Sequence, residues 1–214
     1  DTSFNITEPP AITITTDNQV DPLCFGDCNG MIQITLNGGT PGYNYNWQTL
    51  DGGGIVPGNQ DQLTLCDGTY NLTVTDAGGC TETDSWTLNE PSEMFINGVH
   101  TDVTCNGDCD GTITLNPSGG TPPYNYNWSP AGPAGANPVN LCAGVYSVTV
   151  TDGNGCTKDT TITINEPNEI YFNGSHTNVT CNGDCDGSIT INPTGGTLPY
   201  TINWTPGALS GTNP

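Results

Sequence analysis

The sequence predicts an all-β fold, built from tandem immunoglobulin-like antiparallel β-sandwich repeats stacked as a rod. Three observations support this prediction. Cysteines and a tryptophan recur at a fixed spacing, so that Cys105 and Cys181 lie 76 positions apart, as do Trp128 and Trp204. Segments such as 70–74 alternate apolar and polar residues with the period of two that marks a half-buried strand. No stretch has helical periodicity, and Gly, Asn and Pro separate the alternating segments.

The repeat boundaries follow from self-alignment of the chain. Residues 1–9 match residues 159–167, which close a repeat, and are therefore expected to form the last strand of a preceding one. The next parts are repeat 1, repeat 2 and a partial repeat 3 that is truncated before its last strands: residues 10–90, 91–166 and 167–214. We expect a segment of a longer tandem chain.

Repeat 1 contains an insertion between its tryptophan and its third cysteine. Trp47 and Cys66 are 19 positions apart, whereas Trp128 and Cys142 are 14 apart. Such insertions are accommodated in loops, so the segment 48–65 is expected to be a variable loop and the first place to look for ligand contacts.

Each repeat is expected to contain about seven short strands, as in an immunoglobulin-like sandwich. In repeat 2 five of them are placed by their alternation: the first within 91–104, then 111–116, 124–128, 145–151 and, as the last, 157–164.

The large aromatic residues are expected to fill the sandwich cores, because each repeat has little else of that size. They are Trp47, Trp128, Trp204, Tyr43, Tyr124 and Tyr200. The alternative is a sugar-stacking platform, which requires exposed tryptophans.

Composition narrows the functional class. One basic residue, Lys158, stands against 22 acidic residues, and the formal net charge is −21. Nucleic acids and anionic membrane surfaces are bound through Lys and Arg, so neither is an expected partner. Ten cysteines in tandem register favour an oxidising, extracellular location. No apolar run approaches the ~18 residues of a membrane-spanning helix.

Geometry suggests how the cysteines pair. Cys142 and Cys156 lie at opposite ends of one strand, roughly 23 Å apart, which is too far for a disulfide. Sandwich topology brings the turn after the first strand to the start of the penultimate strand. We therefore predict Cys109–Cys142 and, in repeat 1, the bond between Cys28 and Cys66.

The remaining cysteines leave two alternatives. Cys156 would face the preceding repeat, where Cys24 has no partner, so an inter-repeat bond Cys24–Cys156 is one hypothesis. It would stiffen the array and leave four cysteines without partners within this chain: Cys80, Cys105, Cys181 and Cys185. The other alternative is a local Cys24–Cys28 bond, repeated in the later repeats. A zinc site is disfavoured, because no nearby His completes a ligand set.

The acidic turns are the candidate metal sites. Calcium prefers several carboxylate and carbonyl oxygens, which these turns offer through Asp27, Asp108, Asp110, Asp184 and Asp186. No bidentate Glu follows at EF-hand spacing, so the alternative is that these residues bond their own backbone. No other cofactor is expected. We expect no enzyme, since His100 and His176 have no recognisable catalytic partner and no catalytic motif is present.

The motifs together resemble the SprB repeat. They are Cys-Asn-Gly-Asp-Cys-Asp-Gly from Cys105, Gly-Gly-Thr-Pro-Pro-Tyr from Gly119, Leu-Cys-Ala-Gly-Val-Tyr from Leu141 and Asn-Glu-Pro from Asn165. Repeat 1 departs modestly, with Cys-Phe-Gly-Asp-Cys from Cys24. The resemblance covers essentially the whole chain.

The resemblance implies a large surface adhesin of gliding bacteria, exported by type IX secretion. Its partners would be a substratum or cell-surface polysaccharide, neighbouring repeats of the same chain, and motility and secretion machinery contacted through other parts of the chain. Asp159-Thr160-Thr161 also resembles the O-glycosylation signal of such bacteria, with Thr160 as acceptor. We expect an extracellular, disulfide-stabilised adhesin filament that mediates attachment and gliding. The alternative is a carbohydrate- or calcium-binding module of a secreted protein.

Overall fold

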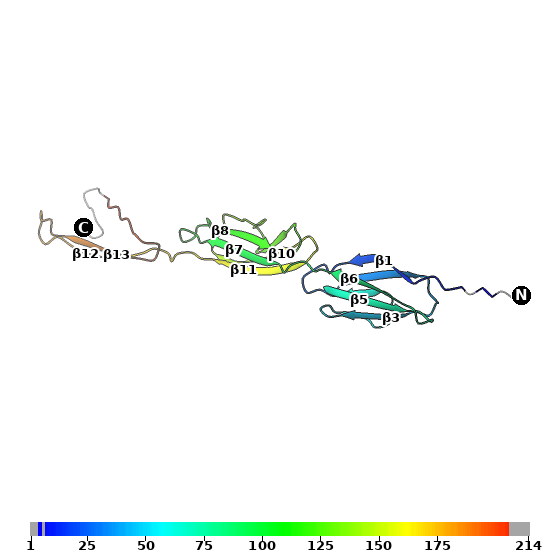
Figure 1. The fold of residues 1–214 in the computed structure, drawn as a ribbon. Coiled ribbons are helices and arrows are strands. Elements are labelled where there is room, and N and C mark those ends of the chain that lie inside the picture. The colour runs from blue at the N-terminus through cyan, green and yellow to red at the C-terminus, as the bar shows by residue number, and fades with distance from the viewer. Residues whose placement is uncertain (1–3, 6, 206–214) are drawn as a thin grey trace. The chain divides into compact units, whose positions relative to one another are not determined.

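The computed structural model describes residues 4–5 and 7–205, and every regular element in this part of the chain is a β-strand (Figure 1). The predicted all-β class is therefore confirmed. None of the described residues belongs to a helix with the length and hydropathy needed to cross a bilayer.

Repeat 1 forms an immunoglobulin-like sandwich of two antiparallel sheets. One sheet has the strand order β1-β2-β4 and the other β3-β5-β6. Their bounds are β1 Thr13–Val20, β2 Gly30–Asn37, β3 Asn44–Thr49, β4 Gln62–Leu65, β5 Gly68–Thr75 and β6 Thr81–Leu88. The register between β5 and β6 is continuous, from Gly68 opposite Leu88 to Thr75 opposite Thr81.

The core of repeat 1 lies between these sheets and follows from the alternation. On β5 the buried Tyr70, Leu72 and Val74 point inward, while Asn71 points to solvent. They pack in one cluster with inward residues of the other sheet, including Ile32. Burial of each such aliphatic side chain contributes about 1.5–3 kcal/mol.

Two tryptophans complete this core. The rings of Trp47 and Trp86 lie 5.2 Å apart between centroids and are tilted by 41°. Trp86 also donates its indole N–H to Thr16 Oγ1 at 2.8 Å.

Repeat 2 contains a two-stranded sheet, β7-β8, and a three-stranded sheet of order β11-β10-β9. The bounds are β7 Phe95–Thr101, β8 Thr112–Ser118, β9 Asn125–Ser129, β10 Gly144–Thr151 and β11 Thr157–Ile164. Its buried positions include Ile113, Trp128, Val148 and Ile164. All five strands lie at or within two residues of the ranges expected from the sequence.

The expected number of strands was too high. The described residues form six strands within 10–90 and five within 91–166, not seven in each. In repeat 2 the counterpart of β4 is reduced to an isolated bridge between Gly111 and Leu141, because the shorter loop leaves too few residues for a strand.

The described residues of 1–9, namely 4–5 and 7–9, contain no strand, and the rest of the expected strand lies outside the described residues. A strand is held by hydrogen bonds to its neighbours, and no described strand pairs with this segment. Its sequence counterpart β11 has β10 beside it.

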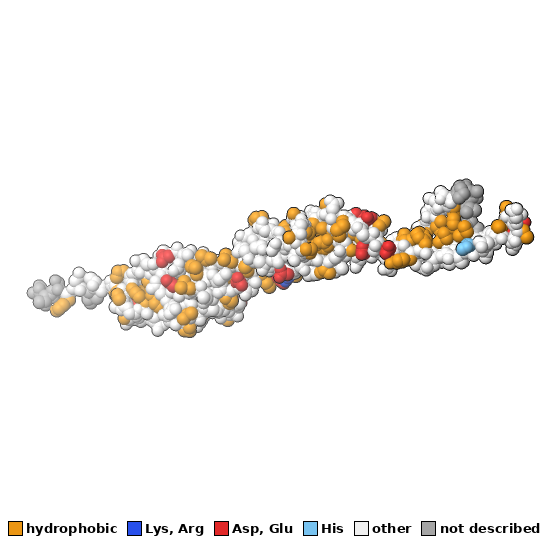
Figure 2. All heavy atoms as spheres, turned by 180° about the vertical axis from the view of Figure 1, so that it is seen from behind, with side chains coloured by type: hydrophobic (Ala, Val, Ile, Leu, Met, Phe, Trp, Pro, Cys, Tyr) orange, Lys and Arg blue, Asp and Glu red, His pale blue; other side chains and the backbone are white. Residues whose placement is uncertain are grey.

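The described part of repeat 3 is one antiparallel pair, β12 (Tyr171–Thr177) and β13 (Ser188–Thr194). Its apolar residues are more exposed than their counterparts: Ile189 is 39% exposed, whereas Ile113 in repeat 2 is fully buried. Figure 2 shows hydrophobic side chains gathered on this segment. Among the described residues, no second sheet covers this face.

The chain divides into two compact units that do not follow the repeat boundaries. The first comprises Asp1–Phe95, Pro117–Asn125 and Val150–Lys158. The second comprises Ile96–Asn116, Tyr126–Thr149 and Asp159–Pro214. The first unit therefore contains two turns of repeat 2, and these turns lead to the candidate site.

Candidate functional site in the cysteine-bearing turns

A four-residue turn follows the first strand of every repeat and carries a cysteine at its start. In these cysteine turns (24–27, 105–108 and 181–184), the aspartate N–H donates to the cysteine carbonyl at 3.1 Å in each case. The third residue is glycine with φ of 79°, 83° and 95°, respectively. This is the type II geometry, which strongly favours glycine at that position.

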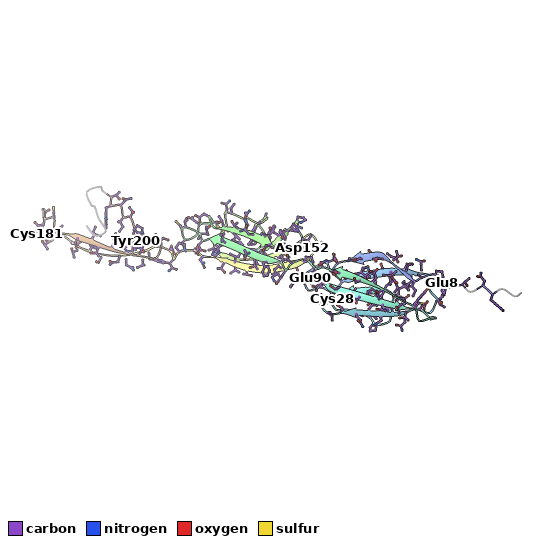
Figure 3. The ribbon with its side chains drawn as sticks, in the orientation of Figure 1. Glu8, Cys28, Glu90, Asp152, Cys181 and Tyr200 are labelled. Atoms are coloured by element: carbon purple, nitrogen blue, oxygen red, sulfur yellow. A yellow bond between two sulfur atoms is a disulfide. The ribbon has the colours of Figure 1, made fainter. Side chains whose placement is uncertain are left out.

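A glutamate from the end of the same repeat holds the turn. The N–H of Gly26 donates to Glu90 Oε2 at 2.5 Å, and the N–H of Gly107 donates to Glu166 Oε2 at 2.9 Å. Both glutamates belong to the Asn-Glu-Pro motif, and Figure 3 labels Glu90. The sequence indicated the motif but not this contact, because the partners are 64 and 59 positions apart.

The candidate calcium ligands two residues after the end of the turn act as caps. Asp110 accepts hydrogen bonds from the N–H of Thr104 at 2.9 Å and from its hydroxyl at 2.6 Å. Asp186 accepts the same two bonds from Thr180. The Thr104 and Thr180 hydroxyls, followed by their N–H groups, lower the pKa of the two carboxyls. In repeat 1 the neutral Asn29 takes this position and accepts from Leu23 N–H at 2.9 Å, so the cap does not require a charge.

The remaining candidate ligands lie in the turns themselves. Asp27 accepts a long 3.4 Å bond from the Asn29 amide, and Asp184 accepts one of 3.4 Å from the Thr180 hydroxyl. The structure gives Asp108 a backbone bond to Cys105 O. Within residues 4–5 and 7–205, no group of three or more His, Cys, Asp or Glu side chains is arranged for a metal ion.

A buried aspartate organises a second turn, between the last two strands of the repeat. Asp152 is 3% exposed; its Oδ2 accepts from Thr121 N–H at 2.8 Å, and its Oδ1 from the N–H groups of Asn154 and Cys156, each at 2.9 Å. Burial raises the pKa of Asp152, but the backbone N–H donors together outweigh it and the pKa is lowered.

Asp76 in repeat 1 is equivalent. It accepts from Thr40 N–H at 2.9 Å and from Cys80 N–H at 2.8 Å, and these bonds, that of Thr40 foremost, lower its pKa. We call the segments 76–80 and 152–156 the aspartate hairpins. Sequence reasoning missed both aspartates. The available signal was an Asp directly after an alternating strand, followed by a Gly-rich turn and a cysteine in both repeats.

Three disulfides join these elements. Cys28–Cys66 and Cys109–Cys142 lie within their repeats, with sequence separations of 38 and 33. Cys24–Cys156 joins the cysteine turn of repeat 1 to the aspartate hairpin of repeat 2, with 5.7 Å between the Cα atoms and a separation of 132. The first two bonds are the pairs predicted from the sequence, and the third is the first of the two alternatives that the sequence left open. Four cysteines are free and exposed: Cys80, Cys105, Cys181 and Cys185.

Polar contacts accompany the inter-repeat disulfide within the first compact unit. The Asn154 amide donates to Leu23 O at 2.8 Å. Lys158, the one basic residue of the sequence, pairs with Glu93 at 2.9 Å. A cleft of about 400 Å³ borders the bond, and Phe25, which lines it, is 53% exposed.

Two of the three predicted core tryptophans are buried, which excludes them as a sugar platform. Trp47 and Trp128 are each 6% exposed, and Trp204 is half-buried. The indoles of Trp47 and Trp128 donate to the carbonyls of Asn59 and Gly135, both at 3.0 Å.

The three core tyrosines have one role in common. The hydroxyls of the half-buried Tyr43 and Tyr124 donate to the carbonyls of Gly38 and Gly119 at 2.5 and 2.6 Å. Tyr200, also half-buried, makes the same bond to the Gly195 carbonyl. Each hydroxyl thereby holds the Gly-Gly turn that precedes its tyrosine in the chain.

The remaining candidates are in ordinary strand environments. Thr160 is half-buried on β11, on the same face as Ile162 and Ile164. His100 is exposed and lies 3.7 Å from Asp102.

The chain is similar to a known repeat family over more than half of its length. The family model of the SprB repeat matches three times, at residues 16–52, 97–133 and 173–209. No curated protein sequence matches the chain. Among solved structures, the N-terminal eight Ig domains of Down Syndrome Cell Adhesion Molecule (DSCAM) isoform 1.30.30 are 12% identical, with a TM-score of 0.40. The match covers 72% of this chain and 24% of that one, so the chain spans about a quarter of its length.

Proposed function

Because this chain belongs to the SprB repeat family, we propose that it is a segment of a repetitive cell-surface adhesin whose consecutive repeats are joined by disulfides. The observation that carries the proposal is the Cys24–Cys156 bond, which links the first strand turn of one repeat to the last hairpin of the next. The role is structural and adhesive, without catalysis.

Composition supports an extracellular setting. Three disulfides require an oxidising compartment, and the net charge of −21 keeps long, repetitive chains from collapsing on one another. The same charge favours an uncharged or cationic substratum or polysaccharide as the surface that is gripped. Export by type IX secretion and movement by gliding machinery belong to the proposal through the family.

Location and adhesion are tested in the parent protein on its own cells. Antibodies against this segment should label intact cells without permeabilisation, and Fab fragments from them should reduce attachment to glass under flow and slow gliding. Absence of surface labelling would overturn the proposed location.

The role of the inter-repeat link is tested with two matched variants. Cys24→Ser/Cys156→Ser removes the bond between repeats, and Cys28→Ser/Cys66→Ser removes one within a repeat. We expect the first variant to fold and reach the surface at the normal level but to release cells at lower shear. The second should lower surface abundance, because it destabilises repeat 1 itself. Attachment strength unchanged in the first variant would contradict the structural role.

A second candidate function is carbohydrate binding at the cleft beside Cys24–Cys156. The observation that favours it is the exposed ring of Phe25, since an aromatic face can stack on a sugar. Calorimetric titration with neutral oligosaccharides should give binding that Phe25→Ala abolishes and Phe95→Ala, an equally exposed phenylalanine, retains. Binding that survives Phe25→Ala would exclude this cleft.

A further inference from the structure

The free cysteine of the first aspartate hairpin has the same surroundings as the bonded cysteine of the second. Cys80 N–H donates to Asp76 Oδ1 at 2.8 Å, and Cys156 N–H to Asp152 Oδ1 at 2.9 Å. The cysteine carbonyls accept the aspartate N–H groups at 3.0 and 2.9 Å. The hairpin is therefore complete without a disulfide, and its cysteine is already positioned.

The same holds for the cysteine turns. Cys105 is free and Cys24 is bonded, yet both carbonyls accept the aspartate N–H at 3.1 Å. Glu166 holds the Gly107 N–H as Glu90 holds that of Gly26. Two kinds of half-site recur. The hairpin kind has one unpaired, exposed example, Cys80, and the turn kind has two, Cys105 and Cys181.

We propose that Cys80 and Cys105 are disulfide half-sites, each of which takes the complementary cysteine of another repeat of this sequence type. The cysteine that opens a cysteine turn belongs to the turn class, and the cysteine that ends an aspartate hairpin belongs to the hairpin class. Cys80 pairs with a cysteine of the turn class, and Cys105 pairs with one of the hairpin class. The partner repeat lies in the same polypeptide or in a second copy of this chain. The proposal rests on the repeat-joining role of Cys24–Cys156 but not on adhesion.

Bond formation requires a disulfide oxidant, either a thiol–disulfide oxidoreductase or a small disulfide such as oxidised glutathione. The Cys80 thiolate attacks the oxidant disulfide and forms a mixed disulfide, releasing one thiolate. The turn-class thiolate then attacks the Cys80 sulfur and releases the second. Two protein thiols are oxidised, one oxidant disulfide is reduced to two thiols, and the two protons pass to them through solvent.

The classes predict selectivity. Cys181 opens a cysteine turn and is a partner for Cys80. Cys185 is the counterpart of Cys28 and Cys109, which bond within their repeats, so it should not be chosen. Two contacts that accompany Cys24–Cys156 are missing at Cys80, because Gly78 and Glu82 stand where repeat 2 has Asn154 and Lys158. Pairing at Cys80 therefore depends on how its hairpin positions the thiol, and not on these two polar contacts.

The test uses the folded 214-residue chain, in which Cys80 and the turn cysteines Cys105 and Cys181 are all free. The chain is incubated with oxidised glutathione, its remaining thiols are blocked, and linked peptides are mapped without reduction. We expect covalent oligomers in which most links join Cys80 to Cys105 or Cys181. Random pairing among four equally reactive thiols would give about a quarter of such links, and that result would overturn the proposal.

Three variants sharpen the test. Cys80→Ser should remove most of the oligomers, whereas Cys185→Ser, the matched loss of one thiol, should leave the Cys80 links unchanged. Asp76→Asn keeps the thiol but loosens its hairpin, and it should lower the Cys80 share at least twofold. An unchanged share would show that the hairpin does not position the cysteine.

Whether the partner repeat lies in the same polypeptide or in a second chain is tested in the full-length protein. Its free thiols are alkylated on intact cells before lysis, and its linked peptides are then mapped. A Cys80 peptide linked to a turn cysteine, with no change of protein mass on reduction, places the partner in the same polypeptide. A fall in mass on reduction places it in a second chain, and a Cys80 alkylated in full overturns the proposal. None of these readings depends on attachment, so failure of the adhesin function remains separable.

Discussion

The loops that follow the tryptophan in repeats 1 and 2 differ in length but satisfy the same requirement of the core. The longer loop supplies the Asn59 carbonyl to the Trp47 indole, and the shorter one supplies the Gly135 carbonyl to the Trp128 indole. Both bonds measure 3.0 Å. A buried indole N–H needs an acceptor, and either loop provides one.

The extra five residues of repeat 1 are used to build structure. They allow the strand β4 and bury Gln62, whose side chain accepts from Val56 N–H at 2.7 Å and donates to Val56 O at 3.0 Å. Repeat 2 replaces this arrangement with a single bridge, Gly111 to Leu141. An insertion into such a sandwich thus brings its own buried polar group, with that group's hydrogen bonds satisfied.

The largest expected effect comes from the disulfides within the repeats. Loops of 38 and 33 residues give nearly equal chain-entropy contributions, about 4 kcal/mol each. We expect Cys28→Ser/Cys66→Ser and Cys109→Ser/Cys142→Ser to lower the free energy of unfolding of their own repeats by similar amounts, measured by calorimetry. A clearly smaller loss in repeat 1 would mean that its longer loop holds the fold without the bond.

Gln62→Ala should come next and act on repeat 1 alone. It removes the acceptor of Val56 N–H and leaves buried groups without partners, at a cost of about 2 kcal/mol. The readout is the position of the repeat 1 transition in urea unfolding. Gln48→Ala changes an exposed glutamine on β3 of the same repeat and should cost little. Equal effects of the two substitutions would show that burial of Gln62 is unimportant.

A smaller effect at neutral pH, but a distinct pH dependence, is expected for Asp152→Asn. The lowered pKa means that the ionised carboxylate stabilises the fold above the unfolded-state pKa of about 3.9, and that this contribution is lost as the pH falls through the lower folded value. Urea midpoints should stay constant from pH 7 to about 5 and then fall.

The asparagine variant should start lower at pH 7 and fall less below pH 4. Asp76→Asn in repeat 1 should behave in the same way, because the aspartates of the two hairpins accept equivalent hydrogen bonds. Parallel acid curves for wild type and Asp152→Asn would contradict the assignment.

The smallest expected effect is common to both repeats. Tyr43→Phe and Tyr124→Phe each remove one hydroxyl bond to a glycine carbonyl, worth about 1 kcal/mol. Thermal melting should show equal shifts, since this end of the sandwich does not include the insertion. Unequal shifts of the melting temperature would show that the longer loop of repeat 1 also affects the stability of this end of the sandwich.

Regular features were predictable from the sequence because they are local or periodic. Alternation placed the strands of repeat 2 at or within two residues, and strand topology indicated which cysteines meet. The contacts that hold the turns were not predictable. Gly26 meets Glu90 across 64 positions and Thr40 meets Asp76 across 36, and neither pair is marked by spacing alone.

The acidic turns show the limit of composition. Asp110 and Asn29 occupy equivalent positions and make equivalent caps, so the carboxylates there are explained without a cation. Residue type alone makes calcium a candidate, whereas the hydrogen-bonded partners identify these residues as caps of the turns.

The Cys24–Cys156 bond also decides which part of the chain can be stretched. Tension applied between a residue before Cys24 and one after Cys156 passes through the bond and bypasses the 132 positions between them. Strands β2 to β10 lie inside this closed loop, and only β1 and β11 of the first two repeats lie outside it. About 450 Å of contour length is thereby withheld from extension. Force applied across the two repeats would load a covalent shortcut instead of unravelling strands β2 to β10.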